Sequence, residues 1–200
     1  MAQKGALPAM RPYHVREVMI TSRQLAARVD ELAREIAAGG HSDNLAVIGI
    51  LRGSFIFLAD LVRWFDRHNL HPRIDFMIME SYGGSMYPEK EPMVSRDCSI
   101  DLQGADVVVV DDILDTGRTL QKAAAHLRAK GAKSLRACAL LDKPSRRRVP
   151  FRADFVGFTI QDVFVVGYGL DYDGRHRELP HIAQVTFADE PPAPGACTPF

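Results

Sequence analysis

The sequence predicts an α/β protein in which helices flank a parallel, twisted sheet and a small β-rich hood is attached. Strand-length apolar runs alternate with helical periods between residues 45 and 141, which is typical of βαβ units. Residues 107–110 are four consecutive valines, as expected for a strand buried on both faces of a parallel sheet. A chain of 200 residues, 46% of them hydrophobic, can bury enough surface to fold without a disulfide or a metal.

The first half of the chain contains two predicted helices and two predicted strands. Apolar residues spaced four, three and four apart predict an amphipathic helix over residues 21–38. The continuous apolar run 45–51 predicts a buried strand, and residues 54–67 repeat the helical spacing. Residues 73–80 predict another strand. Residues 81–97 have no hydrophobic period but contain two adjacent glycines and two prolines, so we expect a long loop.

The second half begins with the valine strand at residues 107–110. A helix is expected over residues 120–130, with a glycine directly after it, followed by a strand over residues 135–141. Three more short strands are expected in the β-rich C-terminal third, at residues 155–160, 164–168 and 182–187. We expect residues 1–187 to form a single domain whose terminal segments build the hood. Residues 188–200 contain four prolines and few apolar residues, which predicts a disordered tail.

The charge balance and the cysteine pattern restrict the functional classes. Lysine plus arginine number 25 and aspartate plus glutamate number 25, which argues against a protein whose main activity is to coat nucleic acid or an anionic membrane. No apolar run approaches the about 20 residues of a membrane-spanning helix, and residues 1–12 lack the apolar core of a secretory signal. Cys98, Cys138 and Cys197 are widely spaced and fit reduced thiols. We therefore expect a cytoplasmic protein.

An acid-rich segment directly follows the four valines and carries the strongest chemical signal. It contains three carboxylates and a Gly-Thr turn, namely Asp111, Asp112, Asp115, Thr116, Gly117 and Thr119. Ligands of open α/β sheets bind at the carboxyl ends of strands. A glycine, two hydroxyls and the N-terminus of the following helix can together bind a phosphate. Because carboxylates repel phosphate, these acids need either Mg²⁺ or sugar hydroxyls as partners, and both fit a phosphorylated sugar.

Three other interpretations of this segment fit less well. The spacing Asp-Asp-x-x-Asp also occurs in isoprenoid synthases, but there it lies on a helix of an all-α protein, whereas valines precede it here. A phosphatase of the haloacid-dehalogenase type requires an Asp-x-Asp spacing at the strand end, which this segment lacks. A solvated acidic turn would leave unexplained why three acids crowd a Gly-Thr loop directly after a buried strand.

Residues 107–120, VVVVDDILDTGRTL, resemble the phosphoribosyl-diphosphate (PRPP) binding motif of type I phosphoribosyltransferases. The surrounding segments resemble hypoxanthine-guanine phosphoribosyltransferases, in the order ILRGSFIFLADL, SYGGS, LLDKPSRR, ADFVGF and FVVGYGLDY. The resemblance covers residues 14–187. It implies the type I phosphoribosyltransferase fold and transfer of the 5-phosphoribosyl group from PRPP to N9 of hypoxanthine or guanine. The implied products are IMP or GMP and pyrophosphate, and the implied cofactor is Mg²⁺.

The resemblance assigns roles around the ribosyl group. Asp111 and Asp112 would bind the 2′ and 3′ hydroxyls of ribose and help to hold Mg²⁺, although the family commonly has Glu-Asp at these two positions. Asp115 would accept the proton near purine N7, and such general-base help is typically worth roughly 10²- to 10⁴-fold in rate. The loop around the 5′-phosphate would consist of Asp115, Thr116, Gly117, Arg118 and Thr119.

The resemblance places the purine base near three other residues. Lys143 would donate to the 6-oxo group, and because an ammonium has donors only, adenine should be rejected. Phe164 and Val165 resemble the base-stacking pair, with the Val165 carbonyl facing the exocyclic amine of guanine. By composition alone, Lys143 would be a solvated loop residue and Phe164 a core residue. The arginine run at residues 146–148 is interpreted as a solvated face or a subunit contact.

The remaining assignments concern pyrophosphate. Asp171 would help to position Mg²⁺ on pyrophosphate, and Arg177 would bind the pyrophosphate itself. The residues between them depart from the family pattern, which leaves Arg175 as an alternative to Arg177. Arg52 and Gly53 fall on the pyrophosphate loop, where an arginine permits bidentate contact.

Ser81 and Tyr82 resemble the start of a mobile lid that would exclude water and so prevent wasteful hydrolysis of PRPP. The expected partners are PRPP and a 6-oxopurine base, with no nucleic acid and no membrane. The family implies a homodimer or a homotetramer. Two alternatives stay open, namely an enzyme that prefers xanthine and a regulator that keeps the phosphoribosyltransferase fold to sense nucleotides and bind RNA.

Overall fold

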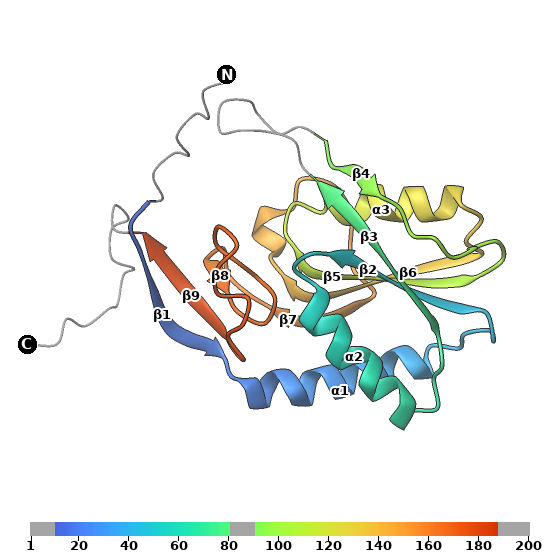
Figure 1. Ribbon diagram of the computed structural model, residues 1–200, viewed down its shortest axis with the longest axis horizontal. Helices are drawn as coiled ribbons and strands as arrows, with labels where there is room; N and C mark the ends of the chain where they lie inside the picture. The colour runs from blue at the N-terminus through green and yellow to red at the C-terminus, as the bar shows by residue number, and fades with distance from the viewer. Residues whose placement is uncertain (1–10, 81–90, 188–200) are drawn as a thin grey trace, which may run out of the picture.

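The computed structural model describes residues 11–80 and 91–187, which form a central sheet with helices on both faces and a smaller sheet at one side (Figure 1). The elements are β1 (Tyr13–Ile20), α1 (Ser22–Ala38), β2 (Leu45–Leu51), α2 (Phe55–Arg67), β3 (Arg73–Glu80), β4 (Met93–Arg96), β5 (Asp106–Leu114), α3 (Arg118–Ala129), β6 (Ser134–Asp142), the 3₁₀ turn η1 (Pro144–Arg146), β7 (Phe155–Thr159), β8 (Phe164–Val166) and β9 (Ile182–Phe187). The central sheet has the order β4-β3-β2-β5-β6-β7, and the smaller sheet, the hood, has the order β1-β9-β8. The predicted α/β class is confirmed.

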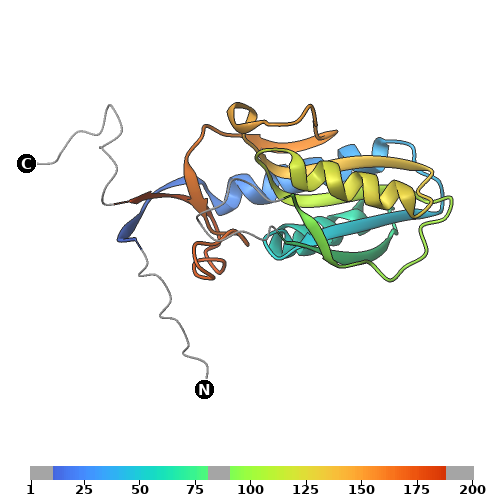
Figure 2. The same ribbon diagram turned by 90° about the horizontal axis from the view of Figure 1, so that it is seen from above.

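The four valines lie in β5, between β2 and β6, and their side chains alternate between the two faces of the sheet. Val108 and Val110 pack in the core that α1 and α2 cover, whereas Val107 and Val109 pack in the core that α3 covers. Figure 2 shows α3, in yellow, lying along the sheet. Strands β3, β2, β5, β6 and β7 all run parallel, so their carboxyl ends meet at one edge of the sheet.

Helix α1 begins where the sequence predicts it. The side chain of Thr21 accepts a hydrogen bond from the backbone of Gln24, and the side chain of Gln24 accepts one from the backbone of Thr21, which is a capping box. The apolar residues at helical spacing, Leu25, Val29, Leu32 and Ile36, are buried against the sheet and against α2. An amphipathic stripe therefore determines which face of α1 covers the sheet.

Two strands were not predicted from the sequence. The residues of β1 are mostly exposed, so the sequence of this strand shows little alternation of apolar and polar residues. Antiparallel pairing with β9 holds β1 in the hood. Strand β4 lies inside the predicted loop 81–97 and pairs antiparallel with β3 at the edge of the central sheet. The prediction of a continuous loop is therefore wrong for Met93–Arg96. Residues 81–90 lie outside the described residues.

Two further corrections concern strands that were predicted. The segment at residues 155–160 was expected among the strands of the hood, but β7 pairs parallel with β6 in the central sheet. Strand β5 does not end at residue 110, because its pairing with β6 continues to Leu114 opposite Asp142. Asp111 and Asp112 are therefore strand residues, and the loop begins only at Asp115.

Residues 188–200, the predicted tail, lie outside the described residues. None of the helices in the described part of the chain is long and apolar enough to cross a membrane.

Candidate active site

Two adjoining pockets lie at the carboxyl ends of β2 and β5. The first, of about 240 Å³, is lined by the end of β2, the end of β5 and the loop that leads to α3. The second, of about 290 Å³, is lined by the ends of β2 and β3 together with the segment after β8. They share Arg52, Gly53 and Asp112. A ligand that fills both pockets would therefore contact both the acid-rich segment and the segment after β8.

The end of β5 places two adjacent carboxyl groups in the wall of the first pocket. Asp111 is buried, and its carboxylate accepts a hydrogen bond of 3.0 Å from the backbone N–H of Asp112. Burial, and next the charge of Asp112, raise the pKa of Asp111 well above its usual value. Burial also raises the pKa of Asp112. Two crowded carboxyls of this kind favour a ligand that donates hydrogen bonds or carries positive charge.

The loop after β5 has the geometry of an anion site. Asp115, Thr116, Gly117 and Thr119 line the first pocket, and Gly117 is the N-cap of α3. Gly117 has φ +85°, and a Cβ at this position would lie 3.0 Å from Val149 and 3.1 Å from Arg147. Both the left-handed backbone and the close neighbours therefore require glycine. The N-terminus of α3 directs its positive end toward the pocket.

Asp115 extends from this loop and ends beside a cation. Its carboxylate lies 3.1 Å from Nε of Arg146, whose guanidinium also lies 3.6 Å from Asp162. The structure thus brings together the predicted proton acceptor and an arginine from the run that was interpreted as a solvated face or a subunit contact.

Lys143 directly follows β6, next to the loop after β5. Its backbone N–H donates to the Leu114 carbonyl at 3.0 Å. Only 6% of the residue is exposed, and Nζ donates to the carbonyl of Val163 at 2.6 Å. Burial lowers the pKa of Lys143, and the nearby charge of Asp115 opposes that shift. A solvated loop lysine, the interpretation from composition alone, is therefore wrong.

Phe164 and Val165 begin β8 and face different environments. Phe164 is 41% exposed, so the interpretation of this residue as plain core is wrong, whereas Val165 is buried. The ring of Phe164 is held edge-to-face by Tyr172 and Phe187, with centroid distances of 5.5 and 5.6 Å. An exposed ring with fixed neighbours can stack on a flat ligand.

The turn after β2 comes very close to β5. A Cβ on Gly53 would lie 1.5 Å from an oxygen of the Asp112 carboxylate. A Cβ on Gly169 would in turn lie 2.1 Å from the Gly53 carbonyl. The peptide bond between Leu51 and Arg52 is cis. Gly169 was not assigned a role from the sequence, although it lies within the quoted segment FVVGYGLDY.

Arg177 rather than Arg175 reaches the second pocket. Arg177 lines this pocket, pairs with Asp171 at 2.7 Å and donates to the Gly169 carbonyl at 2.6 Å. Arg175 is exposed and, among the described residues, is not one that lines either pocket. Within this part of the chain, the geometry favours Arg177 as the predicted pyrophosphate ligand.

The donor set fits a magnesium ion shared with a phosphorylated substrate. Asp112 and Asp171 line the second pocket, while Asp111 lines only the first. The described residues contain no group of three or more His, Cys, Asp or Glu that could hold a metal ion by themselves. Mg²⁺ is usually bound through one or two carboxylates together with substrate phosphates and water, which is what these residues can provide.

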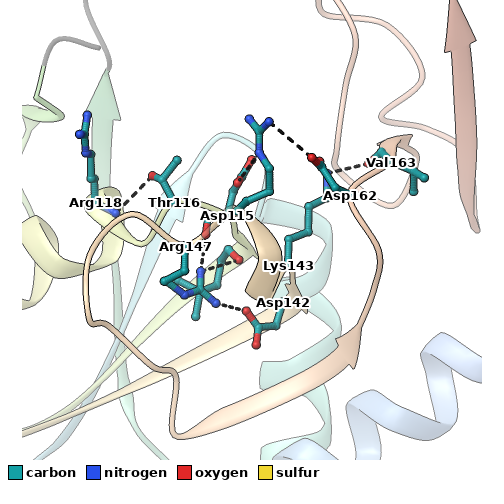
Figure 3. A network of polar contacts seen from close by, with 10 residues as sticks. Asp115, Thr116, Arg118, Asp142, Lys143, Arg147, Asp162 and Val163 are labelled. Atoms are coloured by element: carbon teal, nitrogen blue, oxygen red, sulfur yellow. Dashed lines mark hydrogen bonds and ion pairs between the residues drawn. The ribbon is translucent and has the colours of Figure 1, made fainter. Parts of the chain in front are cut away.

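The arginine run does not behave as one solvated face. The side chain of Arg147 is only 17% exposed and donates to the carbonyls of Leu114 and Asp115 and to the carboxylate of Asp142 (Figure 3). A solvated face is therefore wrong for Arg147, while Arg148 is exposed, and the alternative of a subunit contact stays a prediction. An arginine buried against two carbonyls cannot be distinguished from its exposed neighbours by sequence composition. The predicted lid residues Ser81 and Tyr82 lie outside the described residues.

The sequence and the fold match one class of protein. The family model for the phosphoribosyl transferase domain matches residues 19–173, and the chain belongs to this family. Within it, the chain is similar to two curated proteins. It is 43% identical to the hypoxanthine phosphoribosyltransferase of Escherichia coli K12, over 88% of this chain and 99% of that protein. It is 42% identical to the hypoxanthine-guanine phosphoribosyltransferase of Aquifex aeolicus, over 84% and 94%.

A solved structure agrees with this assignment. The crystal structure of a hypoxanthine-guanine phosphoribosyltransferase from Bacillus anthracis superposes with a TM-score of 0.79 and 37% sequence identity. The match covers 88% of this chain and 100% of that one. The predicted type I phosphoribosyltransferase fold is confirmed.

Proposed function

We propose that the protein is a purine salvage enzyme that transfers the 5-phosphoribosyl group from PRPP to N9 of hypoxanthine or guanine, giving IMP or GMP and pyrophosphate. One observation supports this most directly. Lys143, whose buried ammonium can donate to a 6-oxo group, directly follows β6. Strand β6 pairs with β5, which ends near Asp111 and Asp112 and leads into the loop 115–119. The names of the curated relatives point to the same substrates.

In this proposal each part of the site binds one part of the reactants. Asp111 and Asp112 accept hydrogen bonds from the ribose hydroxyls, and the loop 115–119 holds the 5′-phosphate with backbone N–H groups. Lys143 binds the 6-oxo group of the base. Further contacts are assigned to Phe164 and Val165 for the base, to Arg52, Gly53 and Arg177 for pyrophosphate, and to Ser81 and Tyr82 for the lid.

The chemical step places a proton and a positive charge near Asp115. As N9 bonds to C1 of ribose, the C1–pyrophosphate bond breaks and the sugar has oxocarbenium character, which nearby carboxylates stabilise. The Asp115 carboxylate, whose Oδ1 lies beside Nε of Arg146, accepts the proton released at N7 of the purine. Asp171, with Asp111 and Asp112, would hold Mg²⁺, which would supply positive charge to the leaving pyrophosphate.

The setting of the enzyme is part of the same proposal. We infer a cytoplasmic homodimer or homotetramer that acts on PRPP and a 6-oxopurine without binding nucleic acid. A nucleotide-sensing RNA-binding regulator is not favoured, because the curated relatives are named as transferases. A xanthine-preferring enzyme is not favoured either, because these names refer to hypoxanthine and guanine.

A spectrophotometric assay with PRPP and each of four purine bases tests the proposal. We expect magnesium-dependent formation of IMP or GMP from hypoxanthine or guanine, slower use of xanthine, and no use of adenine. Filter binding of RNA, with and without nucleotide, separates the regulatory alternative. RNA binding without nucleotide synthesis would overturn the assignment.

Replacing Lys143 with alanine is expected to weaken the use of 6-oxopurines far more than the binding of PRPP. A hydrogen bond to a charged group is lost, so kcat/KM for hypoxanthine should fall about ten- to hundredfold. PRPP affinity, measured by titration calorimetry, should change little. Lys122→Ala on the exposed surface of α3 is the control and should leave both quantities unchanged. Equal losses of base use and PRPP affinity would count against a lysine that faces the base.

A further inference from the structure

Arg147 packs against the loop 115–119 and, among the described residues, is not one that lines the first pocket. Its guanidinium donates to the carbonyls of Leu114 and Asp115, and it pairs with Asp142 at the end of β6 (Figure 3). Asp115 and Thr116 line the first pocket, but Arg147 is not among the described residues that do. One side chain thus holds two successive peptide groups of the loop from outside the pocket.

We propose that Arg147 is a positioning residue that orients the backbone N–H groups of Asp115 and Thr116 toward the 5′-phosphate; this inference rests on the proposed function. The two peptide groups are planar and trans, so each N–H points opposite to its carbonyl. The Leu114 carbonyl and the Asp115 N–H belong to one peptide group. The Asp115 carbonyl and the Thr116 N–H belong to the next. Because both carbonyls face Arg147, both N–H groups face away from it.

The charge of Arg147 is balanced locally, so its effect on the phosphate is geometric. The guanidinium pairs with the carboxylate of Asp142, and both side chains are only 17% exposed. The pair carries no net charge toward the pocket. A planar guanidinium can donate to two carbonyls and a carboxylate at the same time, whereas the compact ammonium of a lysine cannot reproduce this fork. The orienting role therefore requires arginine and not merely a cation.

The main chain keeps this region together without the Arg147 side chain. The backbone N–H groups of Arg148 and Val149 donate to the Thr116 carbonyl at 2.9 and 3.3 Å, and that of Lys143 donates to the Leu114 carbonyl at 3.0 Å. Removing the guanidinium therefore frees the peptide group between Asp115 and Thr116 to rotate, while the Lys143 N–H still holds the Leu114 carbonyl and the loop stays attached to the segment after β6. A selective loss of phosphate binding is expected rather than a loss of fold.

The test compares the affinities of IMP and inosine, which differ only in the 5′-phosphate, for Arg147→Met, Arg147→Lys and the wild type. We expect Arg147→Met to weaken IMP roughly ten- to hundredfold, because the Thr116 N–H loses its orientation toward the charged phosphate, and to leave inosine within about twofold. Arg147→Lys should behave like Arg147→Met. Arg148→Met removes the neighbouring exposed arginine and should keep the wild-type ratio of the two affinities.

Each outcome decides between a positioning role and another explanation. An unchanged ratio of IMP to inosine affinity in Arg147→Met, a parallel loss of both ligands, or restoration of IMP affinity by lysine would overturn the inference. If both variants fail to show a cooperative thermal transition, Arg147 is a structural residue and the inference is wrong. If the wild type binds IMP no better than inosine, the proposed function itself fails.

Discussion

Asp115→Asn is expected to lower turnover roughly 10²- to 10⁴-fold while PRPP still binds, because the amide keeps the shape of the carboxylate but cannot accept the proton from N7 of the purine. The backbone N–H groups of the loop, which hold the phosphate in our proposal, are unaffected by this change. Steady-state kcat with hypoxanthine and the dissociation constant of PRPP are the two measurements. Near-normal kcat would contradict the role of Asp115.

The control for this variant is Asp162→Asn. Asp162 is the other carboxylate near Arg146, at 3.6 Å, and its side chain is half exposed. If Asp115→Asn acted only by releasing Arg146, Asp162→Asn should produce part of the same loss of turnover. We expect the control to keep kcat within about twofold, because exposed ion pairs contribute little energy. A shared loss would assign the effect to Arg146 instead.

The parts of the fold that the sequence predicted are those in which local pattern and tertiary environment agree. Four valines in a row can be satisfied only by apolar cores on both sides, which is what Val107 to Val110 have. The cap at Thr21 likewise uses residues three positions apart, so it can be recognised without tertiary information. Strand β1 lacks such a pattern, because its pairing with β9 depends on residues more than 160 positions away.

The same distinction holds for the candidate site. The acids at the end of β5 and the glycine of the loop that follows lie within residues 111–117, so their motif is visible in the sequence. The burial of Arg147 depends on carbonyls about 32 residues earlier in the chain, and nothing in the run of three arginines indicates which one turns inward. The close contact between Gly53 and Gly169 depends on two loops that meet only in the folded protein.

Gly53→Ala is the second substitution for which we expect a large effect, because Gly53 lies against the carboxylate of Asp112. The new methyl group would fall 1.5 Å from one oxygen and 2.5 Å from the carboxyl carbon of Asp112, so this carboxyl or the turn must move. Gly53 has no positive φ, so the effect comes from this collision and not from backbone strain. A displacement of about 1 Å in a reacting geometry can cost about a hundredfold, and we expect kcat/KM for PRPP to fall by at least that factor.

Two comparisons separate the collision from a general loss of stability. Gly104→Ala adds a methyl group where the structure has no atom within 4 Å but where φ is +70°, so it should lower the stability through backbone strain and still retain kcat/KM for PRPP. In an Asp112→Ala background the carboxyl is absent, so adding Gly53→Ala should reduce the free energy of unfolding less than it does in the wild type. Equal losses in the two backgrounds would mean that the methyl group does not meet Asp112. The contact between the pyrophosphate loop and the ribose-binding acid would then not be the cause of the loss.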